Sequence, residues 1–132
     1  VAFVHCSNPL AQQEEISQDL LKQTPIVLRE LGSGTLDVIQ KALQENGIAL
    51  SDLNTEMNLG TTEGIKHFVE HSQCMGIISV RAIYKSIYEQ VFKVLEVENL
   101  KMEREFQFVE KRGETAKLQQ TFKRFITQGY NA

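Results

Sequence analysis

The most constraining feature of this sequence is the alternation of short apolar runs with longer amphipathic stretches along almost the whole chain. Apolar runs of strand length lie at residues 1–6, 26–28 and 75–80, and weaker or alternating runs lie at 54–59 and 91–98. Stretches with apolar residues at helical spacing separate these runs. Strands that alternate with helices of about 10 to 15 residues predict an α/β fold with a largely parallel sheet.

Local signals predict where several helices begin and end. Ser17 is a predicted N-cap, because its hydroxyl can accept a hydrogen bond from a free backbone N–H of the first turn. Pro25 ends the short helix that follows. Gly47 is the expected stop of a second helix, and Gly60 opens a third.

The final third of the chain departs from simple strand–helix alternation. Predicted strands at residues 91–98 and 104–111 are separated by a short polar turn, which is typical of a hairpin. This pair suggests that the final third belongs to a different sheet from the rest. A last helix is expected over residues 115–128, with four apolar side chains facing inward: Leu118, Phe122, Phe125 and Ile126.

Composition bounds the function classes. With 132 residues, 42% hydrophobic and 23% charged, the chain is expected to form one globular domain. A net charge of -3 argues against a nucleic-acid surface in this chain, and no run approaches the roughly 18 apolar residues of a membrane span. Cys6 and Cys74 are interpreted as reduced core thiols, which fits the cytoplasm. Because Val1 opens directly into a strand without a visible signal peptide, the beginning of the protein is expected to have been cut away.

Two turns of small polar residues are candidate ligand sites. Ser33, Gly34 and Thr35 follow one predicted strand, and Thr61 and Thr62 follow another; both groups precede a helix. Small residues at a helix N-terminus let backbone N–H groups point at an anion, and the helix dipole favours negative charge there. In an open α/β sheet, ligands bind beyond the carboxyl ends of the strands. The alternative for each turn is an N-cap without a ligand.

These turns do not match the common nucleotide-binding motifs. No Gly-Lys-Ser/Thr follows Gly34, as a Walker A loop requires, and the third glycine of a dinucleotide fingerprint would fall at Asp37. No nucleophile elbow is present, and neither cysteine is expected to act as a nucleophile with a paired base. We therefore expect neither a cofactor nor an enzymatic activity.

One motif points elsewhere. His67, Glu70 and His71 match the H-x-x-E-H pattern of a zinc-protease class, and histidines four apart share one face of a helix. Phe68 and Val69 form the apolar face of this helix, so the three polar residues are expected to face solvent. No convincing third ligand is evident from the sequence, and a solvated helix face without a metal is the favoured interpretation. A zinc hydrolase that uses these three residues is a further alternative.

Taken together, short motifs along the chain resemble the C-terminal effector-binding domain of LysR-type transcriptional regulators. Their order and spacing match that family over nearly the whole chain. The segments are residues 7–11, 16–26, 28–35, 59–66 and 69–83, followed by Phe106, Val109, Lys111, Phe122 and Phe125. Asn8 stands where the family usually has His, and Leu31 replaces Pro. Ser72 and Cys74 stand where Gly-x-Gly is frequent.

The resemblance implies a fold like that of type 2 periplasmic binding proteins, in which two α/β subdomains are joined by two crossing strands. Residues 1–6 and 75–80 would be the crossing strands. Residues 7–74 would be a complete subdomain, and residues 81–132 the returning half of the other. The first half of that subdomain and the N-terminal winged helix-turn-helix that binds DNA would be absent.

The function implied is that of an effector-sensing module and not of an enzyme. A small effector, expected to be anionic, would bind at Ser33, Gly34, Thr35, Thr61 and Thr62, and His5 and Ser79 would line the cleft near the crossing strands. DNA would be contacted through the missing N-terminal domain alone, a homo-oligomer is expected, and no membrane is involved. The alternative with the same fold is a solute-binding protein of a transport system.

Overall fold

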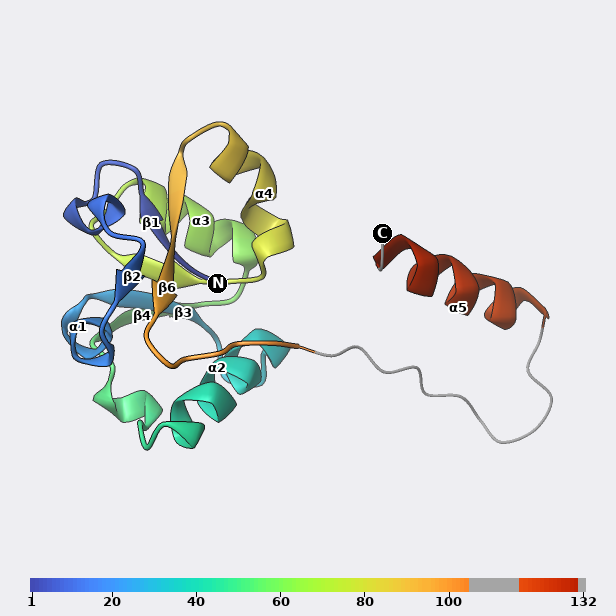
Figure 1. The fold of residues 1–132 in the computed structure, drawn as a ribbon, viewed down its shortest axis with the longest axis horizontal. Helices are drawn as coiled ribbons and strands as arrows, with labels where there is room; N and C mark the ends of the chain where they lie inside the picture. The colour runs from blue at the N-terminus through green and yellow to red at the C-terminus, as the bar shows by residue number, and fades with distance from the viewer. Residues whose placement is uncertain (105–116, 131–132) are drawn as a thin grey trace.

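Six strands form one mixed sheet, and helices pack against both of its faces (Figure 1). The computed structural model describes residues 1–104 and 117–130. In space the strands follow the order β2-β6-β1-β5-β3-β4. Their bounds are β1 Ala2–His5, β2 Glu15–Ile16, β3 Ile26–Arg29, β4 Thr55–Leu59, β5 Met75–Ile77 and β6 Phe92–Val97.

Five of the six strands in the described part of the chain run in the same direction, and β1 runs against them. β1 pairs antiparallel with β5, where Ala2 lies opposite Ile77, and with β6, where Ala2 lies opposite Leu95. The β2–β6, β3–β4 and β3–β5 pairs are parallel. The predicted α/β fold with a largely parallel sheet is therefore confirmed. The carboxyl ends of β3, β4, β5 and β6 meet at one edge of this sheet, which we call the carboxyl edge.

The described residues form five α-helices and two 3-10 helices, and all of them except α5 lie between strands. Ser17 caps α1 as predicted, since its hydroxyl accepts a hydrogen bond from the N–H of Leu20 at 3.1 Å. Gly47 follows the end of α2 with φ +70°, a left-handed conformation that favours glycine. The helices are α1 Gln18–Gln23, α2 Gly34–Glu45, α3 Thr62–Glu70, α4 Val80–Tyr88 and α5 Lys117–Tyr130, with 3-10 turns at Pro9–Gln12 and Leu50–Asp52.

The sheet separates two hydrophobic cores, because successive strand residues point to opposite faces. On one face α1 and α2 pack against the sheet in a cluster that includes Leu21, Leu36, Ile39, Ile26 and Leu28. On the other face α3 and α4 pack in a second cluster that includes Ile65, Val69, Ile83, Phe3 and Val27. The arrangement is a three-layer sandwich with α2 on one side of the sheet and α3 and α4 on the other.

The region after residue 74 departs from the prediction in two ways. The strand expected over residues 75–80 ends at Ile77, and Val80 is already the first residue of α4. The continuous apolar run did not reveal where the strand ends. The expectation of a second sheet was wrong, because β6 pairs with β1 within the same sheet. Strand β1 pairs with β5 on one side and with β6 on the other, and the sequence pattern does not show which strands pair.

The last helix also differs from its predicted environment. Leu118, Phe122 and Phe125 were expected to face inward, yet they are 81%, 60% and 71% exposed. Figure 1 shows α5 apart from the sheet and its helices. Helical periodicity predicts which residues share a face but not whether another element covers that face. Apart from Arg104, which is not in a strand, the strand predicted over residues 104–111 lies outside the described residues.

The cysteines are only partly as expected. Both thiols are free; Cys74 is buried, whereas Cys6 is exposed at the end of β1 and is not a core residue. Strand β1 ends at His5, so Cys6 lies just beyond the strand and outside the core. Among the described residues, no helix has the length and apolar character needed to cross a membrane.

Candidate functional site

Three helices begin at the carboxyl edge of the sheet. Helix α2 follows β3 and has Ser33 as its N-cap, α3 follows β4 and has Thr61, and α4 follows β5 and has Ser79. The first backbone N–H groups of a helix have no partner within the helix and carry partial positive charge. The structure thus places Ser33, Gly34, Thr35, Thr61, Thr62 and Ser79, six of the seven predicted site residues, along one edge.

Along the carboxyl edge, the ends of β3 and β5 lie side by side, and each strand is followed by a helix. The two strands are adjacent and parallel, but α2 leaves β3 toward one face of the sheet while α4 leaves β5 toward the other. Such a reversal leaves a crevice between neighbouring helix N-termini, and in open α/β sheets ligands bind there. Sequence reasoning placed candidate residues on this edge but did not identify this crevice.

A hollow of about 380 Å³ occupies this position, and we call it the edge hollow. Helix α2 contributes Thr35, and the turn into α4 contributes Ser79. Two arginines also line it, Arg81 in the first turn of α4 and Arg104 beyond β6. The other lining residues are Val1, Val38, Ile39, Ile77, Ile78, Val80 and Met102, so the described lining contains no Asp or Glu.

The two helices that meet at the edge hollow lack side-chain caps. Neither the Ser33 hydroxyl nor the Ser79 hydroxyl accepts a hydrogen bond from the helix that follows it. By contrast, Thr61 caps α3, since its Oγ1 accepts a hydrogen bond from the N–H of Gly64 at 2.9 Å. The N-termini of α2 and α4 therefore keep first-turn N–H groups that a ligand oxygen can satisfy.

Arg104 lies against the start of α2. A Cβ built on Gly34 would come within 2.7 Å of Nη2 of Arg104, so the absence of a side chain at Gly34 lets the guanidinium approach the helix backbone. Arg81 adds a second positive charge on the α4 side. Positive charge on two side chains adds to the partial positive charge of two helix N-termini, so this arrangement favours an anion.

The start of α3 is organised differently. Arg29 donates one hydrogen bond to Thr62 Oγ1 at 3.1 Å and two to the Glu30 carboxylate, at 3.0 and 3.1 Å. The hydrogen bonds from Arg29 lower the pKa of Glu30 below its ordinary value. The Thr61 and Thr62 hydroxyls are thus both engaged within the protein, and neither residue lines the edge hollow.

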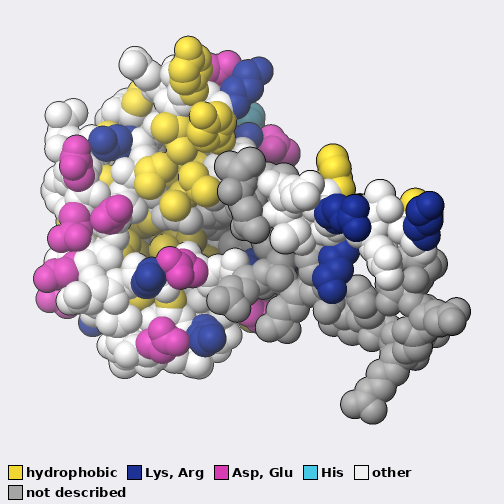
Figure 2. Space-filling view, turned by 45° about the vertical axis from the view of Figure 1, so that its right-hand side comes forward, with side chains coloured by type: hydrophobic (Ala, Val, Ile, Leu, Met, Phe, Trp, Pro, Cys, Tyr) yellow, Lys and Arg dark blue, Asp and Glu magenta, His cyan; other side chains and the backbone are white. Residues whose placement is uncertain are grey.

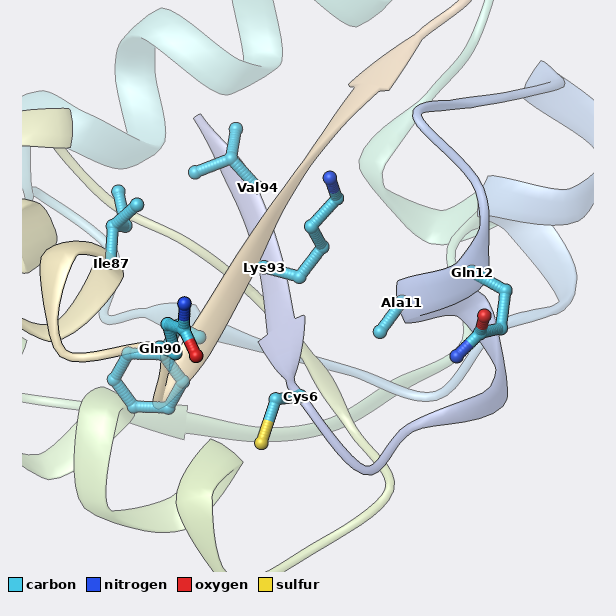
Figure 3. Close-up of a pocket in the computed structure, with 8 residues that line it drawn as sticks. Cys6, Ala11, Gln12, Ile87, Gln90, Lys93 and Val94 are labelled. Carbon is cyan, nitrogen blue, oxygen red and sulfur yellow. The ribbon is translucent and has the colours of Figure 1, made fainter.

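The structure does not bring His5 to this site. His5 ends the antiparallel strand β1, whose first residues lie at the carboxyl edge, so His5 lies at the opposite edge of the sheet. Its Nδ1 lies 2.6 Å from Ser7 Oγ. Near it is a second hollow of about 350 Å³, with Cys6, Gln12, Gln90 and Lys93 among its lining residues (Figure 3).

Sequence reasoning missed the two arginines. Arg81 follows Ser79 by two positions and would have been found by treating the strand at 75–80 as ending sooner. Arg104 lies seven residues beyond the end of β6, and its position depends on β6 running parallel to β5. Knowledge of the sheet order is needed to place it beside Gly34.

The contrast between the caps predicts different stability effects for two matched substitutions. Thr61→Ala is expected to lower the free energy of unfolding by about 1 kcal/mol, the typical cost of losing an N-cap hydrogen bond. Ser33→Ala is expected to cost clearly less, because the Ser33 hydroxyl makes no cap hydrogen bond. Urea unfolding monitored by circular dichroism measures both, and equal losses for the two variants would contradict the assignment.

The chain is similar to a known domain family and to known transcriptional regulators. The pattern of the family described as LysR substrate binding domain matches residues 1–131. The RuBisCO operon transcriptional regulator of Acidithiobacillus ferrooxidans is 27% identical over 106 residues, which are 80% of this chain and 33% of that protein. The HTH-type transcriptional regulator CysL of Bacillus subtilis is 26% identical over 77% of this chain and 33% of its own length. The chain thus spans about a third of these curated relatives.

Solved structures share the fold at low sequence identity. The regulatory domain of Synechocystis PCC6803 CcmR, solved in complex with 2-PG, aligns with a TM-score of 0.75 at 17% identity, over 97% of this chain and 61% of that one. The effector-binding domain of QuiR, solved in complex with shikimate, aligns with a TM-score of 0.65 at 16% identity, over 95% and 57% of the two chains. At these identities the likeness shows the fold, which is that of type 2 periplasmic-binding-protein-like domains.

Proposed function

Because the chain belongs to the LysR substrate-binding domain family, we propose that it is the effector-sensing part of a transcriptional regulator and not an enzyme. The observation that carries this proposal is the edge hollow, where two helix N-termini without side-chain caps meet two arginines. A small anion is the ligand that this chemistry recognises. The complexes of CcmR with 2-PG and of QuiR with shikimate support a small-molecule ligand for this fold.

Most of the predicted residues have a place in the proposed site. The backbone N–H groups at Gly34 and Thr35 and those at the start of α4 would donate to the anion, with the Ser33, Thr35 and Ser79 hydroxyls beside them. Arg81 and Arg104 would supply charge-assisted hydrogen bonds. Thr61 and Thr62 would contact only an effector that extends along the carboxyl edge toward β4, and His5 would not take part.

The proposed domain organisation would let this chain sense such a ligand. Residues 7–74, with α2, would form one subdomain, and residues 81–132, with α4, would belong to the other. The crossing strands β1 and β5 are adjacent and antiparallel, which supports a common hinge between the two. An anion held by both helix N-termini would favour the closed arrangement of the subdomains, since a ligand shifts a conformational equilibrium only by its differential affinity for the two states.

The regulator relatives also support a proposal about the partners of the full-length protein. The full-length protein would bind DNA through a segment that precedes this chain, as an oligomer in the cytoplasm. The match to only about a third of the curated relatives supports a longer protein.

The test uses the full-length regulator that contains this chain, with transcription of its target promoter as the readout. Exchanging Thr35 and Ser79 for alanine is expected to remove the response to the effector while DNA binding, measured by gel shift, persists. Thr61→Ala, which lies outside the edge hollow, is the matched control and is expected to respond normally to a small effector. An unchanged response of the double variant would contradict the proposed site.

A further inference from the structure

Three metal-ligating side chains gather at the last turn of α3, far from the edge hollow, whose residues lie at the other end of the sheet layer. His67, Glu70 and His71 are all exposed, and their ligand atoms all lie within 4.8 Å of one another. Residues at positions i, i+3 and i+4 share one face of a helix, so the backbone itself holds the three side chains together. Phe68 and Val69 point to the core side, as the sequence indicated.

The spacing of the two imidazoles suits a shared ion. Their ring centroids are 4.5 Å apart and the ring planes are inclined by 71°. With metal–nitrogen bonds of about 2.0–2.1 Å and an angle of about 90–110° at the ion, two imidazoles bound to one zinc ion have centroids about 4.5–5.2 Å apart. The helix backbone therefore already holds the two rings close enough to share an ion, and rotation of the side chains would bring the ligand atoms onto it.

The three side chains are also available for coordination. Within the described part of the chain, no hydrogen bond or ion pair engages the side chain of His67, Glu70 or His71. The adjacent cation Lys66 pairs with Glu63 on the preceding turn, at 3.3 Å, and so leaves Glu70 without a competing partner among the described ion pairs. Binding of an ion would break no described hydrogen bond or ion pair of these side chains.

We propose that His67, His71 and Glu70 form a surface site for a divalent transition-metal ion, for which zinc is the probe. Two imidazoles and one carboxylate are ligands that zinc, copper and nickel accept, whereas calcium and magnesium require an all-oxygen set. Water would complete the coordination shell on the solvent side. The ion would tie the last turn of α3 to its C-cap residue His71 and so stabilise the end of the helix that leads into β5.

The proposal is tested by titrating zinc chloride into the chain in a buffer that does not chelate metals, with isothermal calorimetry as the readout. We expect one ion per chain with a Kd of about 1–10 µM, and a rise of the melting temperature with added zinc. His67→Gln or His71→Gln is expected to weaken binding by more than about tenfold, since loss of an outer-shell partner alone costs about 10- to 100-fold. Glu70→Gln is expected to weaken binding less than either histidine variant.

A second variant excludes the other possible zinc site. His5 and Cys6 are adjacent, with Sγ 3.9 Å from Nε2, and could bind zinc elsewhere on the surface. The double substitution His5→Gln and Cys6→Ser is expected to leave the affinity unchanged. The proposal is overturned if the His67→Gln/His71→Gln double variant binds zinc as tightly as the unmodified chain, or if the chain binds none at about 1 mM zinc. All five positions are exposed or half-buried, so folding is expected to survive these changes.

Discussion

Replacing Arg104 by methionine is expected to weaken the binding of a small anionic effector by about 10- to 100-fold. Hydrogen bonds to a charged partner contribute about 1.5–3 kcal/mol, and methionine keeps much of the aliphatic length of the side chain while removing its charge. Arg104 lies over Gly34 at the start of α2 and lines the edge hollow. Calorimetric titration of a panel of small phosphorylated and carboxylic acids measures the loss.

Two controls separate the role of the charge from a structural role. Lys93→Met removes the same charge beside the second hollow, where no effector is expected, and should leave the affinity unchanged. Figure 2 shows that basic and acidic side chains are interspersed on the face it presents, so the loss of a distant charge should have little effect. Arg104→Lys should retain part of the affinity, because it keeps the charge but not the planar fork. Equal losses in Arg104→Met and Lys93→Met would contradict a local contact.

Replacing Gly76 by alanine is expected to destabilise the fold by about 2–3 kcal/mol, at the upper end of the cost of overpacking a core. Gly76 lies in β5, between β1 and β3, and is buried. An added Cβ would come within 2.7 Å and 2.9 Å of two ring atoms of Phe3 and within 3.0 Å of Ile65. The Phe3 ring is fully buried and packs edge-on against Phe92 at 4.9 Å, so it has little room to move.

The matched control is Gly60→Ala. Nothing lies within 4 Å of a Cβ at Gly60, and its φ is not positive, so alanine there is expected to change the free energy of unfolding by less than about 0.5 kcal/mol. Shortening Phe3 to leucine in the Gly76→Ala background is expected to recover part of the lost stability, because the two sites are in contact. Urea unfolding of the three variants measures these changes. A Gly76→Ala chain as stable as the unmodified chain would contradict the close packing of Phe3 on β5.

Features encoded by neighbouring residues could be predicted from the sequence. The start of α1 at Ser17 and the end of α2 at Gly47 rest on local hydrogen bonds and backbone conformation, which a few residues specify. The family resemblance and the candidate turn at Ser33, Gly34 and Thr35 were also available from short motifs. The same reasoning placed His67, Glu70 and His71 on the exposed side of α3, as the structure has it.

Features that depend on the order and direction of strands could not be predicted. His5 was assigned to the cleft because it ends a crossing strand, but the antiparallel direction of β1 carries it to the far edge. Arg104 lies beside Gly34 only because β6 joins the sheet next to β1, which no local pattern encodes. The exposure of Phe122 and Phe125 likewise depends on which element covers α5, and periodicity carries no information about that.

The proposed function depends on binding of a small anion in the edge hollow, between the starts of α2 and α4. The most direct measurement is to map chemical-shift changes in ¹⁵N-labelled chain on addition of the tightest-binding acid from the panel. We expect the largest changes at the backbone N–H groups of Gly34, Thr35, Val80 and Arg81. Changes centred instead on Cys6, Gln90 and Lys93, or no binding by any acid up to about 1 mM, would contradict the proposal.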